Sequence, residues 1–325
     1  MDNLLIAAEV VFPLFIIIFL GYLLKRAGII REKFALEANK LCFNVFLPCL
    51  LFNNIYSVDI HSAFDWKLLL FITVSLIALF AVIWILVTAI CKNNYRRGVM
   101  IQGMYRSNFI ILGLPIATNI CGEQCAAVIG LLLAVALPAY NVFSIIALEV
   151  FNGKHRLETD TANSHLNFSA AKRITRQIIT NPLIIATALA FVFIVINLNL
   201  PKILLQPIQS LAEIAPAFCL LILGAFLEFS SIKDHAKELF AVVLARLIII
   251  PAVMLIIAVQ AGFTGVELAA LLAIFATPSA TAGFTMVQII GGDYRLSANI
   301  VLFTSFISMF TLFLFTYILI NMGLF

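Results

Sequence analysis

Ten long apolar stretches dominate this sequence and restrict what the chain can fold into. They lie near residues 4–24, 34–57, 67–91, 98–120, 124–151, 178–198, 203–227, 238–261, 266–290 and 298–323. Each approaches or exceeds the roughly 20 residues that an α-helix needs to cross a bilayer. Only 11% of the residues are charged, whereas soluble domains average roughly a quarter. The sequence therefore predicts an all-α polytopic membrane protein with ten transmembrane helices.

The basic residues of the connecting loops predict how the chain is oriented. Only two fall on one predicted side, Lys67 and Lys202. Fifteen fall on the other side, namely Lys25, Arg26, Arg31, Lys33, Lys92, Arg96, Arg97, Lys154, Arg156, Lys172, Arg173, Arg176, Lys233, Lys237 and Arg295. Cytoplasmic loops carry an excess of Lys and Arg. We therefore expect both termini outside and the polar loop 152–171 in the cytosol.

The cysteines and histidines form no pattern typical of a metal site. Four cysteines lie in or beside apolar spans, where we interpret them as small hydrophobic residues: Cys42, Cys49, Cys91 and Cys219. A bond between Cys121 and Cys125 at an outer loop is left open. The histidines lie outside the spans and are expected to be solvated: His61, His155, His165 and His235. We expect no metal site and no cofactor.

Two apolar stretches carry polar and helix-disrupting residues near their centres. The fourth contains Arg106-Ser-Asn-Phe-Ile-Ile-Leu-Gly-Leu-Pro115, and the ninth contains Ala276-Thr-Pro-Ser-Ala-Thr-Ala-Gly283. In lipid, an interrupted helix is tolerated only where its freed backbone groups face protein or a water-filled cavity. Interrupted spans at corresponding positions of two halves point to a transporter binding site. We expect the two breaks to cross and to form one substrate site.

Proline-containing segments recur at a nearly constant spacing. Pro13 and Pro182 are 182 − 13 = 169 residues apart, Pro48 and Pro216 are 216 − 48 = 168 apart, and Pro115 and Pro278 are 278 − 115 = 163 apart. This spacing indicates a duplication. Because each half has an odd number of spans, the halves would enter the membrane in opposite directions. We expect a first five-helix repeat at 1–151 and a second, inverted repeat at 172–325.

Several motifs resemble the auxin efflux carrier family, which includes plant auxin exporters and bacterial permeases for malate- or malonate-like acids. They are Ser107-Asn-Phe-Ile-Ile-Leu-Gly-Leu-Pro-Ile116, Pro138-Ala-Tyr-Asn141, and the segment from Pro278 through Gly283-Phe-Thr-Met286 and Gly291-Gly-Asp293 to Asn299. The resemblance implies an inverted-repeat fold similar to bile-acid and sodium/proton transporters. It also implies a scaffold of spans one, two, six and seven, and a moving domain of the other spans. The short central loop favours a bacterial member, in the inner membrane.

The candidate substrate-binding residues come from the two breaks and the fifth span. In the resembling carriers, an asparagine at the position of Asn108 helps to hold the substrate carboxylate; the alternative here is an interhelical hydrogen bond. Gly113, Pro115 and Pro278 would shape the site through unwound backbone after them. The full set is Asn108, Gly113, Pro115, Asn141, Thr277, Pro278, Ser279 and Thr281.

Three charged residues inside spans are further candidates. A charge within a span is costly and suggests function by default, but Arg106 lies near a predicted end, where a long side chain can reach the headgroups. Glu213 and Arg246 could pair with each other, or Glu213 could bind a coupling ion. The sequence leaves these alternatives open.

The sequence favours a secondary active transporter of a small organic anion, such as malate, malonate or an auxin-like acid, working by alternating access. The coupling ion would be Na⁺ or H⁺. The expected partners are membrane lipid and a second copy bound through the scaffold helices, without nucleic acid. There is no nucleotide-binding motif and no nucleophile constellation, so we expect no enzyme activity. The alternatives are a cation/proton antiporter of the same fold and a non-transporting receptor or channel.

Overall fold

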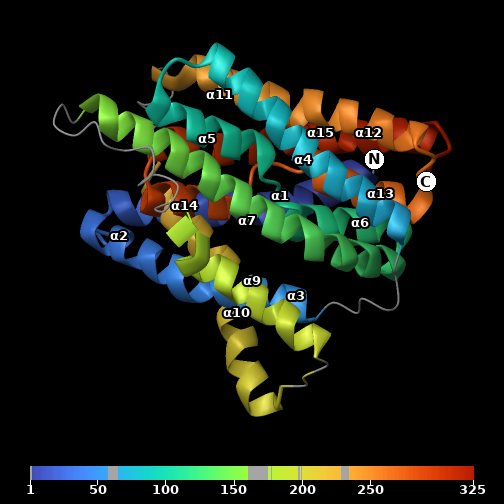
Figure 1. Ribbon diagram of the computed structural model, residues 1–325, viewed down its shortest axis with the longest axis horizontal. Coiled ribbons are helices and arrows are strands. Elements are labelled where there is room, and N and C mark those ends of the chain that lie inside the picture. Colours follow the sequence, from blue (N-terminus) through green and yellow to red (C-terminus); the bar gives the residue numbers. More distant parts are fainter. Residues whose placement is uncertain are drawn as a thin grey trace.

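A computed structural model describes residues 2–57, 65–159, 175–196 without 177, 198, 200–227 and 234–325, and this part of the chain is helical (Figure 1). Six helical segments are long and apolar enough to cross a membrane: Glu32–Tyr56, Trp66–Ile90, Val128–Asn152, Lys202–Ala225, Ala236–Gln260 and Tyr294–Asn321. Shorter apolar helices are Phe109–Cys121, Pro182–Val195, Gly265–Ala276 and Thr281–Ile290. An all-α membrane protein is therefore confirmed. Its ten spans and inverted repeat stay predictions.

The elements follow the predicted stretches, and both spans expected to be interrupted consist of separate helices. One difference in extent is that α7 continues to Thr159, into the predicted loop 152–171. In chain order the elements are α1 (Asp2–Arg26), α2 (Glu32–Leu41), η1 (Cys42–Phe46), α3 (Leu47–Tyr56), α4 (Trp66–Ile90), α5 (Asn94–Tyr105), η2 (Phe109–Gly113), α6 (Leu114–Cys121), α7 (Glu123–Thr159), α9 (Pro182–Val195), α10 (Lys202–Ala225), α11 (Ala236–Leu244), η4 (Ala245–Ile249), α12 (Ile250–Gln260), α13 (Gly265–Ala276), α14 (Thr281–Ile290) and α15 (Tyr294–Asn321).

The three π-helical turns η1, η2 and η4 share one sequence signal. Each ends two residues before a proline, at Pro48, Pro115 and Pro251 respectively. A proline has no N–H, and its ring clashes with the carbonyl of the preceding turn. Widening that turn to an i→i+5 bond accommodates the ring without ending the helix. Two of these turns lie beside the candidate site, where they set the direction of Asn108 and Arg246.

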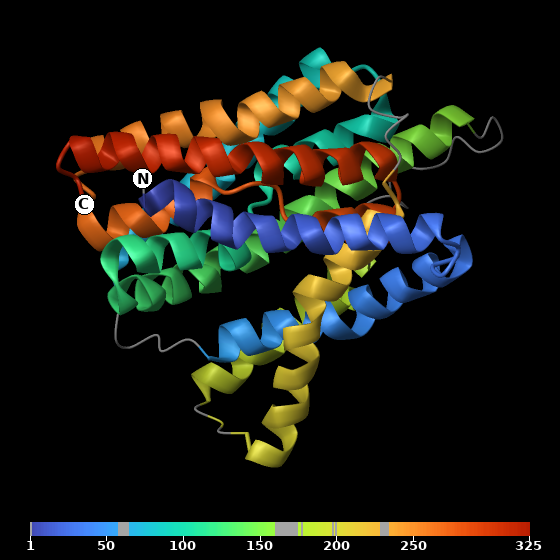
Figure 2. The same cartoon turned by 180° about the vertical axis from the view of Figure 1, so that it is seen from behind.

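The helices form two groups that meet at the centre of the molecule. α2, α3, α9 and α10 lie on one side, and α4 to α7 and α11 to α15 lie on the other (Figures 1 and 2). α1 packs against α10 and α15 and so contacts both groups. The start of α1 and the end of α15 lie at the same end of the molecule, as an even number of membrane crossings requires.

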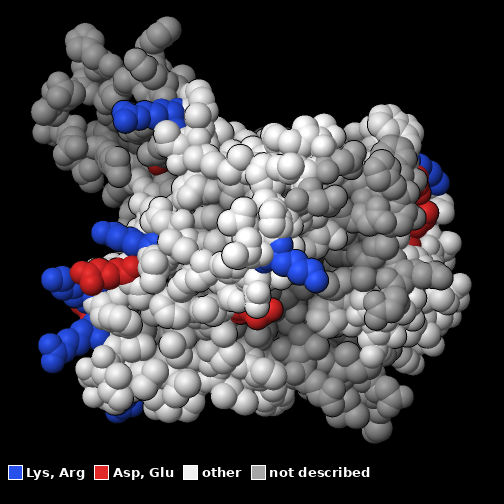
Figure 3. Space-filling model, turned by 90° about the horizontal axis from the view of Figure 1, so that it is seen from below, with Lys and Arg blue, Asp and Glu red and all other residues white. Residues whose placement is uncertain are grey.

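Charged side chains lie toward both ends of the molecule, and most of the basic ones on the face seen in Figure 3 gather at the end opposite the chain termini. On that face, most of the described surface between the two ends is uncharged. An apolar belt between polar ends is what a bilayer-spanning protein requires. Which end faces the cytosol stays a prediction.

One histidine corrects the expectation that the histidines are solvated. His235 is buried, and its Nε2 lies 2.8 Å from Oδ2 of Asp293. Asp293 also lies 3.4 Å from Nε of Arg96, whose Nη1 contacts Glu238 at 2.7 Å. These contacts hold together the first turns of α5, α11 and α15. His61 and His165, and the side chain of His155, lie outside the described residues.

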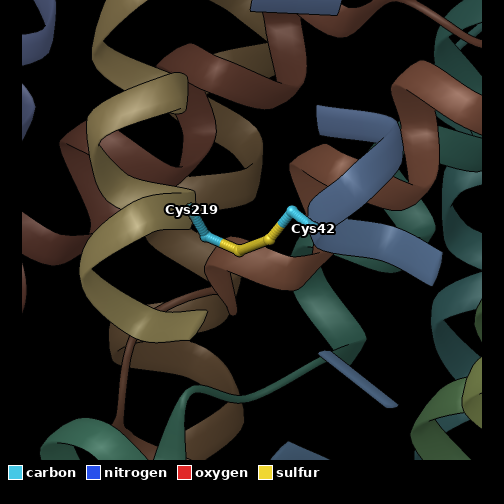
Figure 4. Close-up of a disulfide and its surroundings, with 2 residues drawn as sticks. All are labelled: Cys42 and Cys219. Carbon is cyan, nitrogen blue, oxygen red and sulfur yellow. A yellow bond between two sulfur atoms is a disulfide. The ribbon is translucent and has the colours of Figure 1, made fainter. Parts of the chain in front are cut away.

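A disulfide joins Cys42 of η1 to Cys219 of α10 (Figure 4). The sequence-based interpretation of both cysteines as small hydrophobic residues is therefore wrong. The two residues are 177 positions apart in sequence, and their separation gave no signal of pairing. Cys121 and Cys125 are free thiols, as are Cys49 and Cys91. The bond fastens α2 and α3 to α10 within one helix group.

α1 crosses α10 in direct backbone contact at two glycines. A Cβ on Gly21 would lie 2.0 Å from the carbonyl oxygen of Leu221, and a Cβ on Gly224 would lie 2.0 Å from that of Ile18. Small residues of this kind let membrane helices approach backbone to backbone. The crossing has no room for any other residue type.

Gly224→Ala should therefore destabilise the protein by about 1–3 kcal/mol, as overpacking of a tight contact does. Thermal unfolding of the purified protein in detergent measures this. Ala217→Val, on an exposed position of the same helix, should leave the melting temperature unchanged. Equal melting temperatures for Gly224→Ala and the wild type would contradict the crossing.

Candidate functional site

The two chain breaks lie side by side and are joined by backbone hydrogen bonds. The first break separates α5 from η2 at Arg106–Asn108, and the second separates α13 from α14 at Thr277–Ala280. Ser107 and Ser279 form an antiparallel β-bridge. The N–H of Asn108 donates to the carbonyl of Pro278 at 2.9 Å, and the N–H of Ala280 donates to the carbonyl of Arg106 at 3.2 Å. The expected meeting of the two breaks is thus present in the fold.

The position of each break follows from local chemistry. Thr277 precedes Pro278 and is extended (ψ 156°), because the residue before a proline avoids the helical region. The first break differs from the prediction. We expected unwound backbone after Gly113 and Pro115, but Gly113 ends the π turn η2 and Pro115 lies in the first turn of α6. The chain is instead extended before Asn108, where a β-bridge replaces the lost helical bonds.

Hydroxyl groups complete the pairing of the two breaks. Thr277 Oγ1 donates to the carbonyl of Ala273 at 2.8 Å, and Ser107 Oγ lies 2.6 Å from Thr277 Oγ1. Ser279 Oγ donates to the carbonyl of Gly103, while its N–H donates to Thr304 Oγ1 at 3.2 Å. Thr277 and Ser279 therefore bind protein atoms of the crossing, and this accounts for two of the candidate substrate-binding residues.

Arg246 binds three carbonyl groups at the crossing. Its Nε donates to Thr277 at 2.9 Å, its Nη1 to Met104 at 3.2 Å and its Nη2 to Ile274 at 3.2 Å. Arg246 is fully buried, whereas Glu213 is exposed on α10. Arg246 therefore does not pair with Glu213. It binds the C-terminal ends of α5 and α13 instead.

A small cavity of about 50 Å³ borders the crossing. The first break, the second break and the opposite helix group all contribute to its lining. Arg106 is the only charged residue among them, and none is acidic. The lining residues are Leu47, Leu50, Leu51, Arg106, Ser107, Asn108, Ile110, Ile111, Leu137, Tyr140, Leu183, Ala215, Pro216, Cys219, Ala280, Thr281 and Ala282.

Two hydrogen-bond donors in the cavity wall come from the first break. Only 6% of the surface of Asn108 is exposed, and its Nδ2 has no hydrogen-bond partner among the described residues. Arg106 is buried as well, and its Nη1 lies 2.7 Å from the sulfur of Met286. A thioether is a weak acceptor. An anion in the cavity would offer both side chains a stronger acceptor.

The helix ends around the cavity add a directional field. η2 with α6, and α14, begin at the two breaks, and their first residues line the cavity: Ile110, Ile111, Thr281 and Ala282. The first N–H groups of a helix have no acceptor within the helix, and they carry partial positive charge. The ends that begin at the crossing are thus suited to anion binding.

The remaining candidates lie near the cavity without lining it. Asn141 on α7 is fully buried, and both of its amide atoms lack a partner among the described residues. Pro278 is buried and contributes its carbonyl to the pairing of the breaks. Gly113 and Pro115 belong to helical turns. Of the candidate substrate-binding residues, only Asn108 and Thr281 line the cavity, together with Arg106.

The sequence did not single out several residues of this site. Tyr140 lines the cavity, and the centroid of its ring lies 5.1 Å from that of Tyr105. Met286 and Thr304 contact the breaks from α14 and α15. Ser107 directly precedes Asn108 and Tyr140 directly precedes Asn141 in the sequence. Their place beside two candidate residues was therefore a signal that could have identified them. Nothing in the sequence marked Met286 as the neighbour of Arg106.

Two comparisons show which known proteins the chain is similar to. The model of a family described as membrane transport protein matches residues 6–316. A protein of Methanothermobacter thermautotrophicus described as an uncharacterized transporter is 27% identical over 121 residues. That match covers 36% of this chain and 39% of the relative's length.

The contact of Gly113 with α13 generates a prediction. A Cβ on Gly113 would lie 2.8 Å from both the Cβ and the carbonyl oxygen of Ala273. Gly113→Ala should push α6 away from α13, lower the melting temperature by an overpacking cost of about 1–3 kcal/mol and reduce transport. At Gly103, a Cβ would meet only side-chain atoms, at 3.0–3.3 Å. Gly103→Ala should therefore be milder in both assays, and the opposite ranking would contradict this geometry.

Proposed function

The chain belongs to the membrane transport protein family, as the resemblance to auxin efflux carriers predicted, and from this premise we propose that it is a secondary active transporter of a small organic anion. The substrate class is a carboxylate such as malate, malonate or an auxin-like acid. It binds where the two chain breaks meet, in the cavity lined by Arg106, Asn108 and Thr281.

One observation carries the choice of an anion. The cavity lining contains one cationic side chain and no carboxylate. Two helices begin beside the cavity, and their N-terminal ends carry partial positive charge. A carboxylate has acceptor sites for several donors at once. Arg106 offers a charge-assisted bond, and Asn108 Nδ2 offers a donor that is otherwise unpaired. Charge-assisted hydrogen bonds are roughly twice as strong as neutral ones.

The size of the cavity favours a small substrate. Its volume is about 50 Å³, several times the roughly 10–15 Å³ that one water molecule needs by this kind of measure. Most of the lining side chains are apolar, and these would contact the hydrocarbon part of an organic acid. An inorganic anion would leave those surfaces without a partner.

The alternative of a cation/proton antiporter has less support. Such a carrier needs a carboxylate or a comparable acceptor where the cation binds, because an uncompensated charge in a low-dielectric site is costly. The cavity lining has no carboxylate, and Arg106 would repel a cation there. A non-transporting receptor or channel has no specific observation in its favour.

The proposed transport cycle is alternating access of the elevator type. The cavity wall includes α3, α9 and α10 on one side and both breaks on the other. Movement of the breaks past that group would carry a bound anion across the membrane. The ten-helix inverted repeat, a homodimer through the scaffold helices and Na⁺ or H⁺ coupling belong to the same proposal. So does an inner-membrane location with both termini outside.

Thermal unfolding with candidate acids tests the substrate class. Malonate or malate should raise the melting temperature of the purified protein, because a ligand that binds only the folded state stabilises it, by about 2.7 kcal/mol at 100 times Kd. The matched neutral compound malonamide should not. Repeating the assay with and without Na⁺ and at two pH values identifies the coupling ion. Equal responses to malonate and malonamide would contradict anion binding.

Asn108→Ala tests the site directly. Loss of a hydrogen bond to a charged group costs about 1.5–3 kcal/mol, so substrate affinity should fall about ten- to a hundredfold, and uptake into proteoliposomes should be lost at low substrate concentration. The unfolding temperature should stay near the wild-type value, because Nδ2 bonds no described protein atom. Asn44→Ala, at an exposed asparagine of η1, is the matched control. Wild-type transport by Asn108→Ala would remove Asn108 from the site.

A further inference from the structure

Arg246 is the bulkiest fully buried side chain in the described structure, and it lies within the π turn η4. Its three guanidinium nitrogens each donate to a different backbone carbonyl, at Met104, Ile274 and Thr277. Met104 belongs to the last turn of α5, and Ile274 and Thr277 belong to the end of α13. A single cation thus binds the C-terminal ends of both interrupted helices.

These carbonyls form a cation site made of backbone oxygen. The last carbonyls of a helix lack a partner within the helix and together carry about half a negative charge. Two such ends amount to about one negative charge, which one guanidinium compensates. No ion pair between Arg246 and an acidic side chain occurs among the described residues. Its counter-charge is therefore the pair of helix ends.

Compensation at this point changes the potential in the neighbouring cavity. Four helix ends converge at the crossing, two negative and two positive, and the positive pair begins at cavity-lining residues. Without Arg246, the negative ends would cancel much of the field of the positive ends. With Arg246 in place, the positive ends and Arg106 dominate the cavity.

We propose that Arg246 is a specificity-determining residue: a built-in counter-cation that fills the carbonyl site at the crossing and thereby makes the adjoining cavity selective for anions. This inference rests on the proposed anion site. Arg246 does not line the cavity, and it acts through the two helix ends that it holds. It is therefore a positioning residue.

The geometry explains why the residue is an arginine. A planar guanidinium presents its donors in a fixed fork, whereas the ammonium of a lysine is a compact point charge on a flexible stem. Only the fork reaches three carbonyls from two helices with Nε, Nη1 and Nη2 at the same time. The wide turn η4, two residues before Pro251, gives the side chain its place between α5 and α13.

The test removes the side chain and returns its charged group as a free ion. Arg246→Ala should lower carboxylate affinity at least tenfold, read as a raised KM for uptake and as a weaker thermal shift with malonate. Guanidinium chloride at low millimolar concentration should raise the melting temperature of this variant and restore its affinity severalfold. It should do neither for the wild type, whose site is full. Sodium chloride at equal ionic strength is the control for salt.

A second arginine supplies the matched control. Arg97 also donates to backbone carbonyls, those of Cys91 at 2.6 Å and Thr88 at 3.1 Å, but it does so at the end of α4, away from the crossing. Arg97→Ala should leave the KM for carboxylates unchanged, and guanidinium should not alter it. An equal rise in KM for both variants would overturn the specific role of Arg246.

Two outcomes separate this inference from the proposed function. Guanidinium binding to Arg246→Ala, seen as thermal stabilisation, needs no substrate, so it would persist if the anion assignment failed. If Arg246→Ala shows no guanidinium effect beyond that of sodium chloride, the carbonyl site is refuted. Should Arg246→Ala not fold, Arg246→Lys and Arg246→Met decide: Arg246→Lys keeps the positive charge without the fork, so it should retain severalfold higher carboxylate affinity than Arg246→Met, which loses the charge. Equal affinities for those two variants would overturn the proposal.

Discussion

The structure depends on how backbone groups are satisfied where two helices stop inside an apolar protein. An unpaired N–H or C=O that is buried away from water costs as much as a lost hydrogen bond or more. In the β-bridge between Ser107 and Ser279, the backbone N–H and C=O groups of one break form hydrogen bonds with those of the other. Neither break could exist alone in a bilayer. Each is the hydrogen-bonding partner that the other requires.

The meeting of the two breaks has an electrostatic consequence. Each break contributes the C-terminus of one helix and the N-terminus of the next, so two helix C-termini and two N-termini converge on one place. The C-terminal carbonyls are taken up by Arg246 and by the hydroxyls of Thr277 and Ser279. The N-terminal ends face the cavity instead. An anion is favoured because the C-terminal carbonyls already accept hydrogen bonds from the protein, whereas the N–H groups at the N-terminal ends are available to a ligand.

Much of this arrangement could be predicted from the sequence, and the reason differs from element to element. Apolar length predicted the helices, and Pro278 after Thr277 predicted the second break. The first break was misplaced, because Pro115 is accommodated by a π turn and the chain opens earlier, at Arg106–Asn108. The partners of Arg246 could not be read from the sequence, since they are backbone carbonyls, which every residue has. The Cys42–Cys219 disulfide and the burial of His235 depend on tertiary contacts that leave no local pattern.

The two buried arginines near the breaks, Arg106 and Arg246, differ in their hydrogen-bond acceptors, and this difference indicates different roles. Arg246 has three strong acceptors and no contact with the cavity. Arg106 lines the cavity, and its one described side-chain bond is to a sulfur atom. A buried charge without strong acceptors is costly, so Arg106 gains from an anion what Arg246 already gains from the fold. Arg106 in the cavity wall and Arg246 at the crossing, with no acid in that wall, both disfavour a cationic substrate. The bound anion would then be the counter-charge that completes the site.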